Sequence, residues 1–301
     1  MTYKLLTLVS ALLFLGAGPS VAQTSTNKDQ IVETPFTFVR GSVVLQVKIK
    51  DKGPFNMVLA TGSAASTLSS ELSRELKLQA FFGPSSYDPK TNTYGSYSQV
   101  SGLRTSQNES MAWTLNMSLA GLSSLSQDMG IPIHGILGYA FFKGKIIQID
   151  YPNRIIRFIP DSAPPDSQPT NTAAPKQRVV IPFQISSEIQ IPIIGAVAID
   201  GKEVRALLDT SQGVAVALTP EAVKLLGFPA APEKAPPRID KVSEIKIGAL
   251  QVGSPRTAFF GKGSGKDHAL GEYGAVLGGD LLSNFVVTFD YQRKRIVFEQ
   301  R

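Results

Sequence analysis

The sequence predicts an all-β protein made of two related lobes, each with one short helix. The 301 residues include 26 glycines and 20 prolines, and so many turn-forming residues favour strands joined by short connections. A three-part pattern in the first half recurs in the second, and a proline-rich stretch separates the halves. With 43% hydrophobic and 18% charged residues, the composition is that of a globular protein, and the length suits two domains.

The N-terminus has the pattern of a secretory signal peptide over residues 1–22. Lys4 is the only charge before an apolar run from Leu5 to Leu15, and Ser20 to Ala22 supply small residues for cleavage after Ala22. The run is too short to span a bilayer comfortably. We therefore expect an exported protein, periplasmic or extracellular, with no integral membrane segment once the signal is removed. Residues 23–35 are largely polar and are expected to be mobile.

The first lobe is predicted to cover residues 36–160. Residues Phe36 to Ile49 are rich in β-branched side chains and end in strand-like alternation. A turn at Lys52–Pro54 should lead into a further strand ending at Leu59. The segment Ser69–Leu76 then has polar starting residues and leucines four apart, which predicts the short helix of this lobe.

A linker is predicted at residues 161–178, where prolines alternate with small polar residues that cannot build a core. The second lobe should cover residues 179–301. Its helix has a stronger signature, because Thr219 can cap it, Pro220 suits its first position and Gly227 suits its end.

The repeat is seen best at two turn motifs that lie 149 positions apart. Val58–Gly62 reads Val-Leu-Ala-Thr-Gly, and Leu207–Ser211 reads Leu-Leu-Asp-Thr-Ser. Downstream, Gly135–Gly138 (Gly-Ile-Leu-Gly) matches Ala275–Gly278 (Ala-Val-Leu-Gly) at a spacing of 140. The second half is therefore nine residues shorter between its turn and its glycine segment. A period this long indicates duplicated domains, not a solenoid.

The closing segments of the two halves also match. Ile149–Tyr151 and then Arg154–Phe158 correspond to Phe289–Tyr291 and Lys294–Phe298, again 140 positions apart. Each closing segment reads as a hairpin whose Asp precedes a Tyr. We interpret these aspartates as turn or strand-end residues, because Asp readily binds local backbone groups.

Together the three motifs, in this order and repeated, resemble the aspartic peptidases, in particular bacterial exported members of the retropepsin-like group. The resemblance covers nearly all of residues 36–160 and 180–301. It implies two acid-protease β-barrel lobes, retropepsin- or pepsin-like, related by a pseudo-twofold axis. It also implies a pair of aspartates, one from each lobe, that share a proton and activate water. Asp209 matches one of these positions, whereas Ala60 stands at the other and has no group that can transfer a proton.

The residues around the pair follow the family pattern more closely. Thr61 and Thr210 match the threonines whose hydroxyls link the two turns. Gly62 matches the small residue that follows, whereas Ser211 departs from glycine but remains small. The segments ending in Gly138 and Gly278 resemble those that pack beneath the turns.

A flap over the substrate is also implied by the resemblance. Residues 87–110 have the polar composition of a flexible hairpin, with Tyr94, Gly95 and Tyr97 as candidate tip residues for substrate binding; an ordinary surface loop is the alternative. In the second half, residues 228–238 contain four prolines, which lack the donor that a strand ladder needs, so no flap is expected there.

No cofactor and no metal are expected, and the chain has no cysteine and only two histidines. The net charge of +6 comes from scattered residues, so nucleic acid is not an expected partner. We expect an extended peptide or an unfolded protein segment as partner. A pairing of two chains through Asp209 would require one lobe to leave its covalent partner, so we expect a monomer.

Two functions remain open. The first is an aspartic-type endopeptidase that is weak or inactive, because losing a general acid or base typically costs about a hundred- to ten-thousandfold in rate. The alternative is a non-catalytic protein that binds peptides in the cleft between the lobes.

Overall fold

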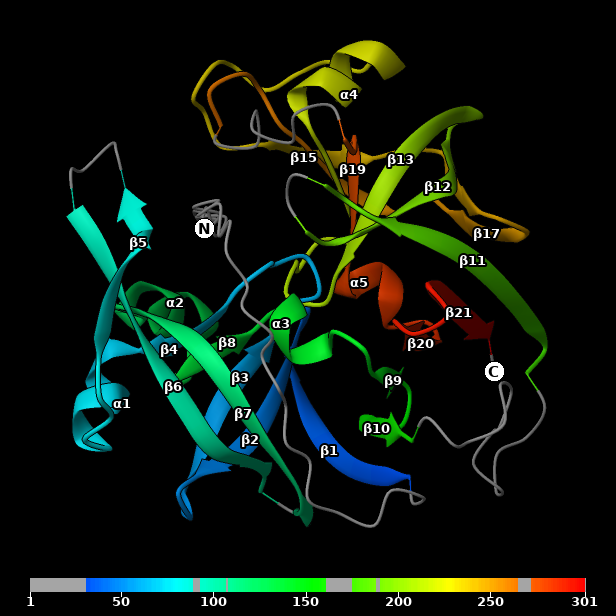
Figure 1. Ribbon diagram of the computed structural model, residues 1–301. Helices are drawn as coiled ribbons and strands as arrows, with labels where there is room; N and C mark the ends of the chain where they lie inside the picture. The colour runs from blue at the N-terminus through cyan, green and yellow to red at the C-terminus, as the bar shows by residue number, and fades with distance from the viewer. Residues whose placement is uncertain are drawn as a thin grey trace.

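The computed structural model describes residues 31–88, 93–106, 108–160, 175–187, 190–264 and 272–300. The expected signal peptide and residues 161–174 of the expected linker lie outside these ranges. Within them the chain forms two lobes rich in β structure, seen at lower left and upper right in Figure 1. None of the helices in these ranges has the length and apolar character needed to cross a bilayer.

The first lobe is built on a sheet that contains both hairpins and parallel pairs. Its strands are β1 (Val32–Val39), β2 (Ser42–Ile49), β3 (Lys52–Leu59), β4 (Ser66–Ser69), β5 (Phe81–Asp88), β6 (Thr93–Thr105), β7 (Asn108–Ala120), β8 (Gly135–Leu137), β9 (Ile146–Asp150) and β10 (Ile155–Ile159). Its helices are α1 (Ser70–Glu75), α2 (Ser123–Met129) and α3 (Tyr139–Phe142). Thus α1 is the expected helix, capped by the Ser69 hydroxyl, and α2 and α3 are additional short helices.

The second lobe repeats this plan with a shorter central part. Its strands are β11 (Gln177–Ile185), β12 (Pro192–Ile199), β13 (Lys202–Asp209), β14 (Val216–Leu218), β15 (Arg238–Lys241), β16 (Glu244–Ile247), β17 (Leu250–Gly253), β18 (Arg256–Phe259), β19 (Ala275–Gly278), β20 (Val286–Asp290) and β21 (Arg295–Gln300). Its helices are α4 (Pro220–Leu226) and α5 (Gly279–Leu282). The expected caps of α4 are present: Thr219 accepts from the Ala222 N–H, and Gly227 ends the helix with φ 79°.

Three boundaries differ from the sequence expectations. The segment expected to be mobile enters β1 at Val32, because Val32 and Thr34 alternate inward and pair with β10. The expected linker ends early, since β11 begins at Gln177 and pairs with β21. The hairpin turn expected at residues 52–54 lies instead at Lys50 and Asp51, whose φ values of 50° and 63° suit a two-residue hairpin turn.

A six-stranded antiparallel sheet joins the lobes, in the order β1-β10-β9-β20-β21-β11. At its centre Gln148 of β9 lies opposite Thr288 of β20, and the Gln148 Nε2 donates to the Thr288 Oγ1 over 3.1 Å. These two residues are equivalent under the 140-residue repeat. The pseudo-twofold axis of the duplicated chain therefore passes between them.

The two aspartates of the closing hairpins stabilise this sheet. Asp150 is fully buried and binds Asn153 and the Arg157 guanidinium, with Nη1 to Oδ2 at 2.9 Å. Asp290 receives the corresponding contacts from Arg293 and Arg295. Both are turn and ion-pair residues, in agreement with the sequence interpretation.

The two lobes also contact each other backbone to backbone, at positions where a residue with a Cβ would not fit. The carbonyl oxygen of Gly41, in the turn between β1 and β2, lies so near Gly279 that a Cβ there would be 1.7 Å away. A Cβ on Gly41 itself would lie 2.5 Å from the Cα of Gly213. The first-lobe turn is therefore in direct backbone contact with the loop that follows Asp209 and with the start of α5.

Replacing Gly279 by alanine should lower the free energy of unfolding by about 1–3 kcal/mol, the usual cost of overpacking. The new methyl group would overlap the Gly41 carbonyl, and a backbone atom cannot move away without shifting the lobes. Urea denaturation of the variant checks this. The matched control is Gly253→Ala, since a Cβ on Gly253 meets no atom within 4 Å. Equal stability of the two variants would contradict the expected lobe contact.

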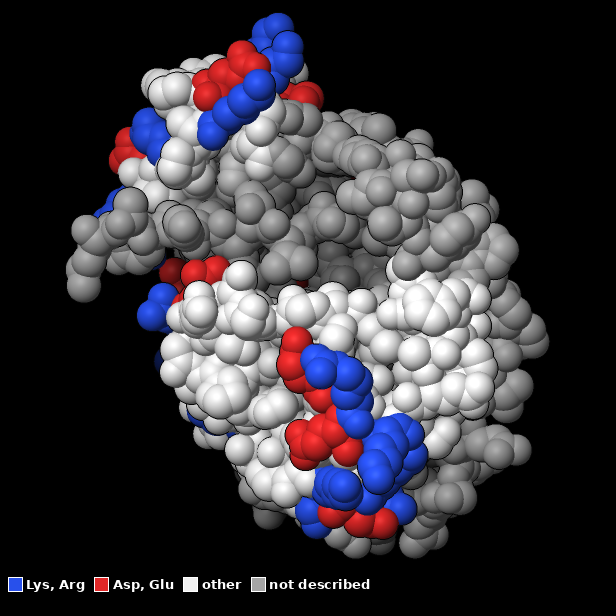
Figure 2. Space-filling model, turned by 90° about the vertical axis from the view of Figure 1, so that its left-hand side faces the viewer, with Lys and Arg blue, Asp and Glu red and all other residues white. Residues whose placement is uncertain are grey.

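On the face shown in Figure 2, basic and acidic side chains of the described residues lie next to one another, and neither sign forms an extended patch of its own. This agrees with the scattered distribution of charge in the sequence.

Candidate functional site at the junction of the two turns

The two turn motifs follow equivalent strands. β3 leads into Ala60 and β13 ends at Asp209, and each pairs in parallel with a downstream strand, β8 or β19. The register is the same in both lobes, with Leu59 opposite Leu137 and Leu208 opposite Leu277. The glycine segments therefore pack beside the turns as the resemblance implied, despite the nine-residue difference in length.

Glycine at the end of each segment has a steric reason. A Cβ on Gly138 would lie 2.2 Å from the Ala65 carbonyl oxygen, and a Cβ on Gly278 would lie 2.1 Å from the Val214 carbonyl oxygen. Ala65 and Val214 are themselves 149 positions apart. The close approach of the glycine to a carbonyl oxygen thus occurs at equivalent positions in both lobes, and the backbone around the two turns is equivalent.

The threonines link the two turns across the axis. The Thr61 Oγ1 donates to the Leu208 carbonyl over 2.7 Å, and the Thr210 Oγ1 donates to the Leu59 carbonyl over 2.6 Å. Each hydroxyl also accepts the backbone N–H of the other threonine, at 3.2 and 3.3 Å. Both threonines are buried. The structure thus brings the two turns together in a nearly symmetric arrangement.

The carboxylate of Asp209 is held on one side only. Its Oδ1 accepts the Ser211 N–H at 2.9 Å and the Ser211 hydroxyl at 2.7 Å. Its Oδ2 lies against Gly62: a Cβ on that glycine would be 2.9 Å from it. Within the described residues no protein donor is found for Oδ2. Ala60 occupies the equivalent place on the other turn, and its methyl group is buried.

The first lobe supports the Asp209 turn directly. The Val43 N–H donates to the Thr210 carbonyl at 3.0 Å, and the Ser42 hydroxyl donates to the Ser211 carbonyl at 2.9 Å. Under the 149-residue repeat, Pro192 is the residue equivalent to Val43. Proline has no N–H, so the second lobe cannot make the equivalent hydrogen bond to the Ala60 turn. The sequence analysis missed Ser42 and Val43, although this valine–proline difference is visible in the sequence.

Two tyrosines lie near the Asp209 charge. Burial and then the negative charge of Asp209 raise the pKa of Tyr151, and the same two causes raise the pKa of Tyr273 to about 12. The Tyr151 hydroxyl is buried and finds no hydrogen-bond partner among the described residues. Neither was predicted as a site residue; the signal for Tyr151 was the Asp-Tyr pair repeated at Tyr291.

Apolar side chains flank both turns. Leu207 lies on the same face of β13 as Asp209, in a buried cluster that Tyr273 and the first-lobe Tyr139 also contact. Val58 lies on the same face of β3 as Ala60, in a cluster that includes Leu125 of α2. The centre of the site therefore has one polar acceptor between two apolar surfaces.

A hairpin is present in the region of the expected flap, but the candidate tip residues lie on one of its strands. β5 and β6 pair antiparallel, and Tyr94, Gly95 and Tyr97 lie on β6 instead of at a turn. The Tyr97 ring stacks on Phe81 at 5.6 Å. The connection, residues 89–92, lies outside the described residues. In the second lobe no strand forms between Phe228 and Pro237, as its prolines predicted.

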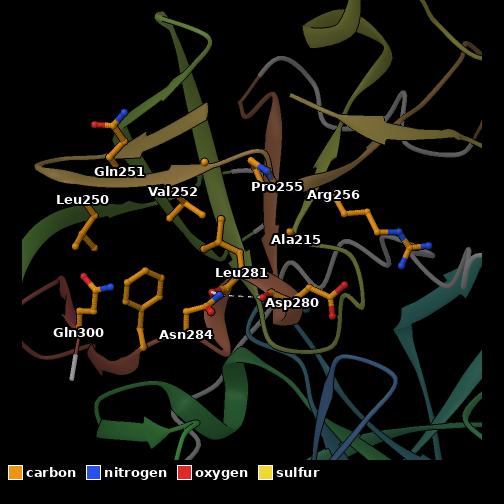
Figure 3. Close-up of a pocket in the computed structure, with 12 residues that line it drawn as sticks. Ala215, Leu250, Gln251, Val252, Pro255, Arg256, Asp280, Leu281, Asn284 and Gln300 are labelled. Atoms are coloured by element: carbon orange, nitrogen blue, oxygen red, sulfur yellow. Dashed lines mark hydrogen bonds between the residues drawn. The ribbon is translucent and has the colours of Figure 1, made fainter. Parts of the chain in front are cut away.

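A separate cavity of about 450 Å³ lies in the second lobe between α5, the β17–β18 connection and the last strand. Its apolar lining includes Leu250 and Phe285, and Figure 3 shows Asp280 and Arg256 at one end and Gln300 at the other. Asp209 does not line it. Among the described residues, no three His, Asp or Glu side chains are grouped so that they could hold a metal.

Comparison with solved structures gives the same architecture. The aspartic proteinase of Irpex lacteus superposes with a TM-score of 0.50 over 90% of this chain and 97% of its own, at 13% sequence identity. The chain has the aspartic-proteinase fold. A retropepsin-like aspartic protease from Rickettsia conorii matches 41% of this chain and 91% of its own, with 15% identity and a TM-score of 0.31. No family model and no curated protein matches the sequence.

The aspartic-proteinase fold accounts for the positions of the two turns, the threonine link and the interlobe sheet. At 13% identity it does not carry an activity to this chain. What the centre of the site can do follows from its own residues: one carboxylate, the two threonines that hold the turns, and no second acid.

Proposed function

We propose that this chain is an exported member of the aspartic peptidase superfamily whose interlobe cleft binds an extended peptide, and that it hydrolyses the peptide slowly or not at all. Two features of the site carry the proposal together: the threonine link between the turns is intact, and Ala60 stands at the position equivalent to Asp209. The fold and the flap hairpin support a peptide ligand. The signal-peptide pattern of residues 1–22 supports export.

The chemistry of the centre favours binding over hydrolysis. The family reaction needs one carboxylate to take a proton from water and a second, protonated carboxyl to bond the scissile carbonyl. Asp209 supplies one carboxylate and Ala60 stands where the second would be, and a carboxylate accepts hydrogen bonds but donates none. Its Oδ2 is therefore suited to a peptide N–H, and the apolar surfaces on both sides are suited to neighbouring side chains.

The test combines binding and turnover. The purified protein should bind extended peptides on an array and should leave a denatured protein substrate uncut from acid to neutral pH. Asp209→Ala should weaken binding about 10- to 100-fold, the loss of a hydrogen bond to a charged group. The matched control, Asp280→Ala, removes a carboxylate of the same lobe that faces the separate cavity and should bind normally.

Two results would count against this proposal. Robust cleavage that is lost in the Asp209→Ala variant would show an active endopeptidase despite Ala60. Absence of binding to any extended peptide, in a protein whose thermal unfolding is cooperative, would remove the peptide-binding function.

A further inference from the structure

Residues 60–62 and 209–211 of the two turns differ at two of their three positions. Under the 149-residue repeat Ala60 corresponds to Asp209, and Gly62 corresponds to Ser211. One turn thus has the acid and a serine, whereas the other has neither. The structure gives a physical reason for the two differences to occur together.

Gly62 is in contact with the carboxylate across the axis. A Cβ built on Gly62 would lie 2.8 Å from both the Cβ and the Cγ of Asp209, and 2.9 Å from its Oδ2. Carbon atoms of separate residues do not approach so closely without a shift of the chain. A side chain at position 62 would therefore overlap residue 209, and two of the three overlapped atoms, Cγ and Oδ2, are atoms that alanine lacks.

On the other side of the axis, a carboxylate at position 60 would meet the side chain of Ser211 in the same way. The threonine link is symmetric to within 0.1 Å in both of its hydrogen-bond pairs, so the two turns approach each other in equivalent ways. By this symmetry the Cβ of Ser211 lies beside residue 60, as a Cβ on Gly62 would lie beside Asp209, whereas the Ser211 hydroxyl points to the Asp209 Oδ1. The Ala60 side chain has no Cγ and no oxygen. Because Ala60 is buried, a longer side chain at this position could not turn into solvent.

Ser211 also has contacts that hold it in place. Its N–H and its hydroxyl both donate to the Asp209 Oδ1, and its carbonyl accepts the Ser42 hydroxyl of the first lobe. The serine thus orients the remaining carboxylate. Glycine at this position would keep the N–H contact and lose the hydroxyl contact.

We infer that Ala60 and Ser211 are a complementary pair: the Ser211 side chain takes the space that a second carboxylate would need, and it positions Asp209 as a single acceptor. The packing of the site thus accommodates one carboxylate, and the loss of the second acid involves two positions, 60 and 211, instead of one. Restoring a second acid therefore requires Ser211→Gly together with Ala60→Asp. This inference rests on packing and holds whether or not the chain binds peptide.

The experiment is a mutant cycle read by thermal unfolding. Ala60→Asp alone should lower the melting temperature on the order of 5 °C, as expected for an overpacked site in a chain of this size. Adding Ser211→Gly should recover most of this loss. Adding Ser211→Ala should not, because alanine keeps the Cβ and removes only the hydroxyl. The effect of Ser211→Gly should thus have opposite signs in the parent protein and in the Ala60→Asp variant.

Proteolysis of a denatured substrate gives a readout beyond stability. The double variant should cleave with pepstatin sensitivity and an acidic optimum, about 100-fold or more faster than Ala60→Asp alone. Should Ala60→Asp fail to fold, recovery of folded protein by Ser211→Gly but not by Ser211→Ala is the same expected result. The inference is overturned if Ala60→Asp melts like the parent, if glycine and alanine at position 211 act alike, or if Ala60→Asp cleaves as fast as the double variant.

Discussion

Replacing Arg157 by methionine should lower the free energy of unfolding at neutral pH by about 3–5 kcal/mol, the usual cost of removing one partner of a buried ion pair. The Arg157 side chain is 6% exposed, and that of Asp150 is fully buried. The guanidinium donates to Asp150 at 2.9 Å, to Gln148 at 3.1 Å and to Glu33 at 2.6 Å. Methionine fills the volume but removes the guanidinium that compensates the charge of the buried carboxylate.

The loss should depend on pH. Burial alone would raise the pKa of Asp150, but hydrogen bonds from Asn153 and Arg157 outweigh burial and hold the pKa below its ordinary 3.8. A lowered carboxyl pKa stabilises the fold above the pKa of the unfolded chain, and this contribution disappears as the pH falls through the folded value. The parent protein therefore loses this stability in acid, whereas the variant has already lost most of it.

Urea denaturation at pH 7 and near pH 3 measures both effects. The difference between parent and Arg157→Met should be large at pH 7 and smaller in acid. Arg74→Met is the control, because Arg74 is 77% exposed and its pair with Glu71 spans 3.8 Å, so little change is expected. A loss at pH 7 no larger than that of Arg74→Met would contradict the role given to Arg157.

Replacing Thr210 by valine should lower the free energy of unfolding by about 2–6 kcal/mol, because two buried backbone groups lose their partners at about 1–3 kcal/mol each. The Thr210 hydroxyl donates to the Leu59 carbonyl and accepts the Thr61 N–H, both from the other lobe. Valine has nearly the same shape, so packing is preserved and only the hydrogen bonds are removed. The pseudo-symmetry predicts a similar loss for Thr61→Val.

The matched control is Thr257→Val. Thr257 is also fully buried, but its hydroxyl donates to the carbonyl of Pro255, two residues away, and it links no lobes. Equilibrium denaturation of the three variants checks the comparison, and peptide binding by Thr210→Val should weaken as well, because Asp209 is the residue next to the lost contact. If Thr210→Val costs no more than Thr257→Val, the threonine link does not hold the lobes together.

Much of the fold was predictable because its signals are local. The helix at Pro220–Leu226 was predicted by its cap, its proline and its terminal glycine, and the structure has all three. The prolines after Phe228 correctly excluded a second flap. A hairpin was predicted in residues 87–110 too, but its tip was placed on Tyr94, Gly95 and Tyr97, which lie on β6. Tyrosine suits a strand as well as a loop, so composition did not separate the two.

The candidate site was predictable in part. Ala60, Asp209 and their neighbouring threonines were located by the repeat, and the structure brings the two turns together. Ser42, Tyr151 and Tyr273 were not predicted, because their local sequence does not show that they approach Asp209. Ser42 reaches the Asp209 turn from the other lobe, and the two tyrosines come near the Asp209 charge only through the fold.

The sequence by itself determined the duplicated β architecture, the position of the two turns and the absence of one carboxylate. These features depend on turn residues, strand alternation and the repeat, which can be recognised in short segments of the chain. Only the tertiary structure decided that the Ser211 carbonyl accepts the Ser42 hydroxyl, that Arg157 neutralises a buried Asp150, and that Gly279 lies on the backbone of Gly41. Ser211 and Gly279 meet partners more than 140 positions away, and Arg157 reaches Asp150 only through strand pairing. Such contacts follow from how the lobes close on each other.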